Sequence, residues 1–153
     1  MSSGGMYGAA LRTDDPQYLE ESFSGSQAYA RTKRMQVALA RSWADELADD
    51  GTTVHSMHPG WVDTPGVAAY LPKFRAVTLP FMRTPDQGAD TMVWLAAAPL
   101  PSDSSGRFWH DRQTRSTGYG RSGVDLDDAH RQELWDYCNL ATNIQPGTVP
   151  SSS

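Results

Sequence analysis

Apolar residues recur at every fourth position in the segment between residues 27 and 48. On a helix these positions form one continuous stripe, made of Met35, Leu39, Trp43 and Leu47. The run Asp49-Asp50-Gly51 follows directly and supplies a glycine stop. The pattern therefore predicts a helix over residues 27–48.

Two further helices are indicated by their caps and periodicity. Thr84 is followed by a proline, an acid and a glutamine, which together are typical of a helix start. Its predicted inward face consists of Ala89, Met92, Val93 and Ala96. A last helix is expected over about 127–140, with Leu134, Trp135 and Cys138 on its apolar side.

Strand signals are short and few. Residues 52–57 are β-branched at the start and end before His58-Pro59-Gly60, which indicates a strand followed by a turn. Residues 106–110 form an aromatic strand candidate. The remaining segments are expected to be irregular: residues 1–27 and 110–124 as loops, and 65–81 as a loop with a short helix.

The order helix, strand, helix, strand, helix predicts an α/β fold with a parallel layer. A chain of 153 residues has room for one domain. We assign that domain to residues 1–145 and expect residues 146–153 to be a flexible tail.

Composition narrows the class of protein. The net charge of −5 and the lack of a long basic run argue against nucleic acid as a partner. Four cations near the start of the first helix are interpreted as its solvated flank: Arg31, Lys33, Arg34 and Arg41. No apolar run reaches the length of a membrane span, and Met1-Ser2-Ser3-Gly4-Gly5 is unlike a signal peptide. With one cysteine, Cys138, the sequence favours a cytoplasmic protein.

No metal site is expected, because a single cysteine cannot form a multi-cysteine site. His55 and His58 alternate on the first predicted strand, and no third ligand accompanies them. We interpret both as hydrogen-bonding side chains. His110 and Asp111 are interpreted as polar residues at the end of a strand.

Tyr29 and Lys33 are the most informative pair in the sequence. Four residues apart on a helix, their side chains share one face, one turn apart. At ~4 Å and an effective dielectric constant of ~20, an ammonium stabilises a tyrosinate by about 4 kcal/mol. Such a tyrosine is a usable general acid or base. The alternative is a surface tyrosine beside a solvated lysine.

Three motifs follow one another in a fixed order: Ser2-Ser3-Gly4-Gly5, the Tyr29/Lys33 pair, and Pro59-Gly60-Trp61-Val62-Asp63-Thr64. Together they resemble the C-terminal half of the short-chain dehydrogenases/reductases. The resemblance runs from Ser2 to about Arg112. The stretches at 2–7, 58–67 and 87–92 are similar to one group within that family. The implied fold is partial Rossmann-like: the C-terminal half of a doubly wound parallel sheet, without its N-terminal βαβ units.

The resemblance also implies roles for individual residues. Tyr29 would be the catalytic acid/base, Ser3 would hydrogen-bond the substrate carbonyl, and Lys33 would assist Tyr29 and contact the nicotinamide ribose. Hydroxyl groups of this kind stabilise the negative charge that hydride transfer develops on a carbonyl oxygen.

The loop after the first strand would lie beneath the nicotinamide. Its matching residues are Pro59, Gly60, Val62 and Thr64. A glycine after a strand lets the backbone approach a flat ring closely. The turn Pro59-Gly60 and a helix-capping Thr64 are the plainer alternatives.

A second glycine motif, Gly118-Tyr119-Gly120-Arg121-Ser122-Gly123, has the glycine spacing of the dinucleotide fingerprint but not its structural context. A functional fingerprint follows a strand and opens a βαβ unit. This one is followed by a single helix. We therefore interpret it as a loop.

The function expected from these features is an NAD(P)-dependent oxidoreductase acting on a carbonyl or alcohol substrate. The cofactor would be NADP or NAD, and the apolar segment from Pro65 to Met82 is compatible with a lipophilic substrate. The family's phosphate-binding glycines precede the serine motif, so we expect a fragment whose cofactor binding is impaired. The alternative is a non-catalytic interaction module that forms a homo-oligomer through helix 27–48.

Overall fold

The computed structural model describes residues 1–100, 102–118 and 127–143 of the chain. Most of the glycine motif at 118–123 and the predicted tail at 146–153 lie outside these described residues. The regular elements, in chain order, are η1 (Gly4–Gly8), α1 (Gly25–Glu46), β1 (Ser56–Met57), α2 (Pro65–Tyr70), α3 (Pro72–Thr78), η2 (Leu79–Phe81), α4 (Pro85–Ala97), η3 (Ser102–Ser104), β2 (Phe108–His110), β3 (Gln113–Arg115) and α5 (Asp128–Thr142).

Helix α1 is the central packing element, and the predicted helix over 27–48 is confirmed within two residues at each end. Its Val37 and Ala38 are fully buried in a core shared with η1, β2 and α5, whose members are Met6, Phe108 and Leu134. The predicted apolar stripe lies beside this core. Trp43 from that stripe is 41% exposed and packs edge-on against Trp135 of α5, at 4.9 Å between ring centroids.

The sheet is mixed, whereas the sequence predicted only parallel strands. β1 pairs with β2 in parallel, and β2 pairs with β3 in antiparallel register, with His110 opposite Gln113. β3 falls in the predicted loop at 110–124. Its three residues are all exposed, so it has none of the hydrophobic alternation by which a strand is recognised. The strand expected over 52–57 is only Ser56–Met57.

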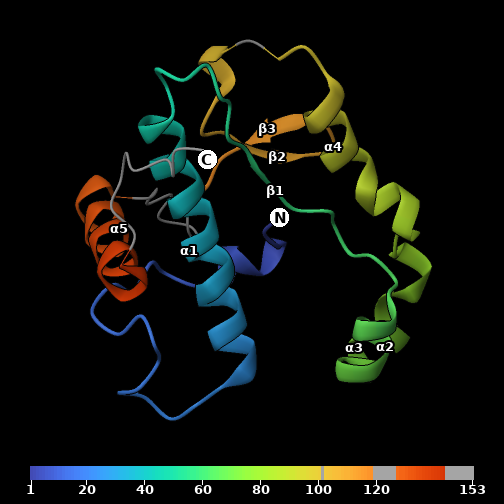
Figure 1. The fold of residues 1–153 in the computed structure, drawn as a ribbon. Helices are drawn as coiled ribbons and strands as arrows, with labels where there is room; N and C mark the ends of the chain where they lie inside the picture. The colour runs from blue at the N-terminus through green and yellow to red at the C-terminus, as the bar shows by residue number, and fades with distance from the viewer. Residues whose placement is uncertain (101, 119–126, 144–153) are drawn as a thin grey trace, which may run out of the picture.

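Helices cover the two faces of the sheet. Successive residues of a strand point to opposite faces: Phe108 of β2 packs with α1, while Trp109 contacts Trp94 of α4 at 5.3 Å between centroids. Figure 1 shows α1 and α5 on one side of the strands and α4 on the other, with α2 and α3 below α4. The predicted loop with one helix at 65–81 contains two short α-helices and a 3-10 turn.

Helix α4 starts as predicted but buries a different face. The capping box is formed: Thr84 Oγ1 accepts from Gln87 N, and Gln87 Oε1 accepts from Thr84 N. Met92 and Val93, predicted to point inward, are 43% and 60% exposed. The buried positions are Gly88 and Thr91, because small residues there allow close contact with the neighbouring loop and turn.

The interpretation of Arg31 and Arg34 as a solvated flank is wrong, since they are 6% and 2% exposed. Arg34 donates to the backbone oxygen of Thr117 at 2.7 Å. Arg31 forms an ion pair with Glu21 and lies over the ring of Tyr18. Buried charges need such partners. The partner of Arg34 is distant in the sequence, whereas those of Arg31 lie in the loop before α1. Helix α5 is confirmed, with Asp127 capping it and Leu134 and Trp135 buried.

Candidate active site

Tyr29 and Lys33 lie on adjacent turns near the start of α1. The Lys33 ammonium is 5.5 Å from the centroid of the Tyr29 ring, so the predicted juxtaposition is present. Lys33 Nζ also donates to Gln36 Oε1 at 3.1 Å. Tyr29 is 52% exposed, which leaves its ring accessible to a ligand.

Ser3 is the cap of η1, where its Oγ accepts from Gly5 N at 3.2 Å. A Cβ built on Gly5 would lie 3.5 Å from Cε1 of Tyr29 and 3.6 Å from the Ser3 Oγ. The tyrosine ring and the serine hydroxyl therefore flank the same glycine. Gly5 thus lies next to two predicted site residues that are 26 positions apart in the sequence.

Ser2 fixes the position of this N-terminal segment. Its side-chain hydroxyl donates to the backbone oxygen of Lys33 at 2.8 Å, and its backbone N donates to the oxygen of Met57 at 2.6 Å. Ser2 is only 4% exposed. The segment that carries Ser3 is thus attached both to α1 and to the end of β1.

The loop after β1 begins at His58, next to the same segment. A Cβ on Gly4 would lie 3.6 Å from the His58 ring. Gly60 has φ +81, a left-handed conformation that favours glycine, and its N donates to His58 Nδ1 at 3.2 Å. His58 therefore makes the kind of hydrogen bond that was expected of it. His55 does so too, since its Nδ1 accepts from Trp109 Nε1 at 3.2 Å.

The remaining loop residues that were predicted to hold the cofactor have structural contacts. Val62 forms a parallel bridge with Arg83 and packs on Gly88. Thr64 caps α2, with its Oγ1 accepting from Val67 N at 3.3 Å. Pro59 offers its backbone oxygen to Arg83 at 3.5 Å. A hydroxyl that accepts still has a proton to donate, so the cap leaves Thr64 able to bind a ligand.

His58 is held neutral by its surroundings. Burial lowers its pKa to about 4, and positive charge at His110 and Arg83 contributes in the same direction. Its ring stacks on that of His110, with centroids 3.9 Å apart, and on that of Phe108 at 5.6 Å. Because Nδ1 accepts from Gly60, the proton of the neutral ring is on Nε2.

Arg83 and Asp111 are parts of the site region that sequence reasoning missed. The guanidinium of Arg83 binds Asp111 through two hydrogen bonds, one of them 2.8 Å long. This pairing lowers the pKa of Asp111 to about 2. The two residues are 28 positions apart, and no motif or spacing connects them, so only the tertiary structure reveals the pair.

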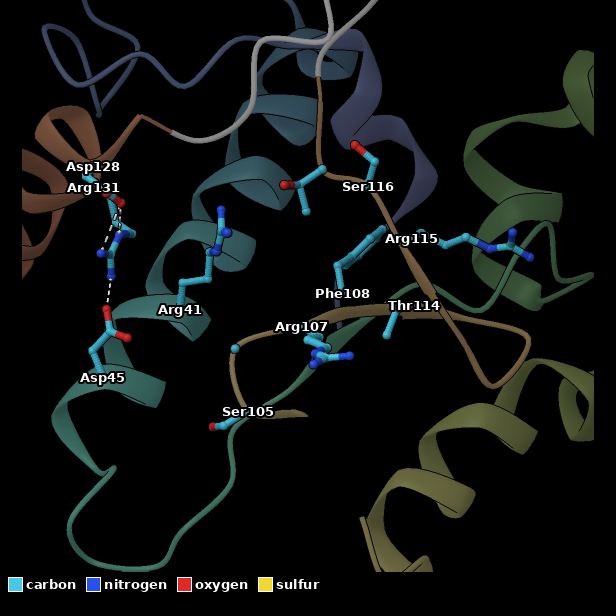
Figure 2. A pocket seen from close by; sticks show the side chains of 12 residues that line it. Arg41, Asp45, Ser105, Arg107, Phe108, Thr114, Arg115, Ser116, Asp128 and Arg131 are labelled. Carbon is cyan, nitrogen blue, oxygen red and sulfur yellow. Dashed lines mark hydrogen bonds and ion pairs between the residues drawn. The ribbon is translucent and has the colours of Figure 1, made fainter. Parts of the chain in front are cut away.

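A pocket lies at the other end of α1. It has a volume of about 540 Å³ and includes Arg41, Phe108 and Arg131 in its lining, but not Ser3, Tyr29 or Lys33. Figure 2 shows Arg131 between Asp45 and Asp128, to which it is paired. Because its lining includes none of the predicted catalytic residues, this pocket is separate from the predicted catalytic site.

The comparison with known proteins agrees with the motifs. A family described as "Enoyl-(Acyl carrier protein) reductase" matches residues 17–100, and the chain belongs to the short-chain dehydrogenase/reductase family. The group that its short stretches resemble is dehydrogenase/reductase SDR family member 12. The chain is 46% identical to that protein from Bos taurus and 44% identical to the one from Homo sapiens. Each alignment covers 88% of the present chain.

A more distant relative is retinol dehydrogenase 14 of Homo sapiens, which is 30% identical over 82% of the chain. The aligned part covers 42% of each member 12 protein and 38% of the retinol dehydrogenase. The chain thus spans less than half the length of these relatives. No solved structure shows a significant match. Among the described helices, none is long and apolar enough to cross a membrane.

Proposed function

We propose that this chain carries the proton-transfer centre of an NAD(P)-dependent oxidoreductase that interconverts a carbonyl and an alcohol. The observation that carries the proposal is the meeting of Ser3 and Tyr29 at Gly5, within 3.6 Å of one Cβ position. In the proposed arrangement, the Tyr29 phenol and the Ser3 hydroxyl both bind one carbonyl oxygen of the substrate beside Gly5. Donors aimed at that oxygen stabilise the charge it develops in the transition state.

Each residue has a distinct part in this mechanism. Tyr29 Oη gives its proton to the substrate oxygen during reduction and removes it during oxidation. Ser3 Oγ donates a hydrogen bond to the same oxygen and orients it. Lys33 Nζ favours the anionic form of Tyr29 through its charge and is placed to bind a ribose hydroxyl.

The donor set fits the nicotinamide half of a dinucleotide. Ammonium and hydroxyl groups at the start of α1 suit a ribose. The backbone at Pro59, Gly60 and Val62 and the hydroxyl of Thr64 suit a carboxamide. The bound NAD(P) would supply the hydride.

The substrate we favour is lipophilic. Between Pro65 and Met82 the chain exposes apolar side chains, among them Tyr70 at 86%, Val77 at 78% and Phe81 at 80%. A related protein of the family is named a retinol dehydrogenase, and retinol is an apolar alcohol. The single cysteine is consistent with a reducing, cytoplasmic setting.

The alternative, a module that associates through α1, has less support. Met35 and Leu39 already pack against the core of this chain, and Trp43 packs on Trp135. That side of the helix therefore has a partner within the chain itself.

Substitution Y29F tests the proposal in a longer protein that contains this chain. We expect turnover to fall by about 10²- to 10⁴-fold, the usual contribution of a positioned proton donor. Cofactor affinity, measured by NADPH fluorescence, should be unchanged. The matched control is Y137F, which alters a tyrosine of α5 whose hydroxyl contacts Gln17 and not the site. A near-normal rate for Y29F would exclude the assignment.

A further inference from the structure

The turn between β2 and β3 has a strained backbone. Its two residues, Asp111 and Arg112, have φ of +53 and +56. Two-residue hairpin turns of this kind normally contain glycine, asparagine or aspartate, so the strain of the left-handed region falls on Arg112. Strain of this sort persists where the surrounding contacts require it.

Asp111 is directed at the loop after β1. Its carboxylate accepts two hydrogen bonds from Arg83 and lies 3.3 Å from His110 Nε2. The other ring nitrogen of His110, Nδ1, lies 3.1 Å from the backbone oxygen of His58 and can donate to it. One carboxylate thus contacts the two side chains that reach the start of the loop.

Arg83 carries the contact on to Pro59 and Gly60. Its Nη1 donates to the Pro59 oxygen at 3.5 Å, and a Cβ on Gly60 would lie only 2.7 Å from its Nε. Its backbone binds the same loop, donating to the oxygen of Trp61 at 2.7 Å and accepting from Asp63 N at 2.9 Å. The Gly60 amide in turn donates to His58 Nδ1. Together these contacts connect Asp111, through Arg83 and His110, to residues 58–60 of the loop.

Arg112 connects the turn to helix α4. Its side chain pairs with Asp90 of α4, and its backbone N donates to Thr91 Oγ1 at 3.2 Å. The turn is therefore attached to α4 on one side and to the loop on the other.

Stability alone does not account for this arrangement. The side chains of Asp111 and Asp90 are each 45% exposed, and ion pairs with such exposure contribute little to folding. They do little to offset the strain at Arg112. Geometric precision at the loop is the remaining benefit.

We propose that the Asp111–Arg112 turn is a positioning element of the candidate active site, which sets the backbone of Pro59 and Gly60 through Arg83 and His110. The functional meaning of that position rests on the proposed function, in which this loop lies beneath the nicotinamide. Asp111 is a positioning residue that acts through Arg83.

The test compares two matched variants of the full chain, D111N and D90N. Each removes one carboxylate of an ion pair at the turn. Only Asp111 contacts Arg83 and His110, the two side chains that reach residues 58–60. Asparagine tolerates the left-handed region, so D111N leaves the backbone of the turn unaltered. In D111N we expect amide hydrogen exchange at Gly60 and Asp63 to accelerate about tenfold, with exchange at Val37 unchanged. D90N should leave the Gly60 rate as in the unmodified chain.

Equal exchange at Gly60 in all three proteins, or equal acceleration in both variants, would overturn the proposal. If D111N does not fold, R83K decides, because lysine keeps the charge but loses the two-pronged geometry; it should accelerate Gly60 exchange as D111N does. Rescue by D111E, with Gly60 exchange restored, would support the charge-mediated contact.

An NADPH titration of the same proteins separates this proposal from the proposed function. If the unmodified chain or a longer protein containing it binds NADPH, D111N should weaken binding several-fold and D90N should not. Accelerated exchange with unchanged affinity would reject the functional part of the proposal. Failure of the unmodified proteins to bind NADPH would count against the proposed function, and the exchange rates would still decide the positioning role.

Discussion

Met6, Val37 and Leu134 belong to three separate elements, and each is at most 2% exposed; Tyr70, Val77 and Phe81 belong to one segment, and each is at least 78% exposed. The first group comes from the core unit, which consists of η1, α1, β2 and α5. The second comes from the 61–97 segment, which contains α2, α3, η2 and α4. Both regions are rich in apolar residues, but only the core unit uses them to exclude water.

The 61–97 segment is held together by local polar contacts. Caps at Thr64 and Thr84 and a two-pronged pair between Asp63 and Arg75 provide them. All residues of α2 and α3 are described, and none is buried. Helices this short are not stable in water by themselves, so their conformation depends on these caps and pairs.

The candidate site lies where the two regions meet. Ser3, Tyr29 and Lys33 stand on η1 and α1 of the core unit, while the loop from Pro59 to Thr64 leads into the 61–97 segment. The elements that carry the proton-transfer groups are thus fixed by buried residues, and the predicted cofactor loop is fixed by polar contacts. The Arg83–Asp111 pair matters because it is one of the polar contacts that hold this loop.

The difference in burial between the two regions is tested most strongly by truncating one phenylalanine in each. Phe108 is 2% exposed in the core unit and Phe81 is 80% exposed in the other. We expect F108A to lower the free energy of unfolding by about 3–5 kcal/mol, through lost burial and a cavity. F81A should change it by less than about 0.5 kcal/mol. Urea denaturation measures both, and similar losses would mean that Phe81 is buried in solution.

An intermediate effect is expected from pH, at the boundary of the two regions. His58 has its pKa lowered to about 4 in the folded chain, against ~6.5 when unfolded. Between these values the unfolded chain binds more protons, so stability is complete above pH ~6.5 and falls as the pH drops toward about 4.

The loss attributable to His58 should be on the order of 2 kcal/mol, allowing for screening by solvent. It is measured as the difference in pH dependence of the unfolding free energy between the unmodified chain and H58N. H130Q, at an exposed histidine, is the control and should keep the full dependence. Identical profiles for H58N and the unmodified chain would show that His58 titrates normally.

The smallest expected effect concerns the difference in stability between helices α4 and α1. T84A removes the capping box of α4 and should cost about 1 kcal/mol. Because α4 is only lightly buried, we expect this to appear as faster amide exchange at Gln87 and Gly88. T32A changes an exposed threonine within α1 and should leave exchange in the core unit unaltered. Uniform acceleration in T84A would instead indicate that α4 unfolds only with the whole chain.

Some features were predictable because they depend on neighbouring residues. The bounds of α1, the capping box at Thr84 and the extent of α5 all follow from caps and periodicity. So does the pairing of Tyr29 with Lys33, since four residues make about one turn of any helix. The order of the three motifs pointed to the family, and the similarity to known relatives confirms it.

Other features depend on residues that are distant in the sequence, and these only the tertiary structure decided. The meeting of Ser3 with Tyr29 at Gly5, the burial of Arg34 and the Arg83–Asp111 pair each join separate segments. The inward face of α4 was predicted wrongly for the same reason: hydrophobicity favours Met92 and Val93, but close packing selects Gly88 and Thr91. Periodicity reports what a helix would bury in general, whereas the shape of the neighbouring surface determines what it does bury.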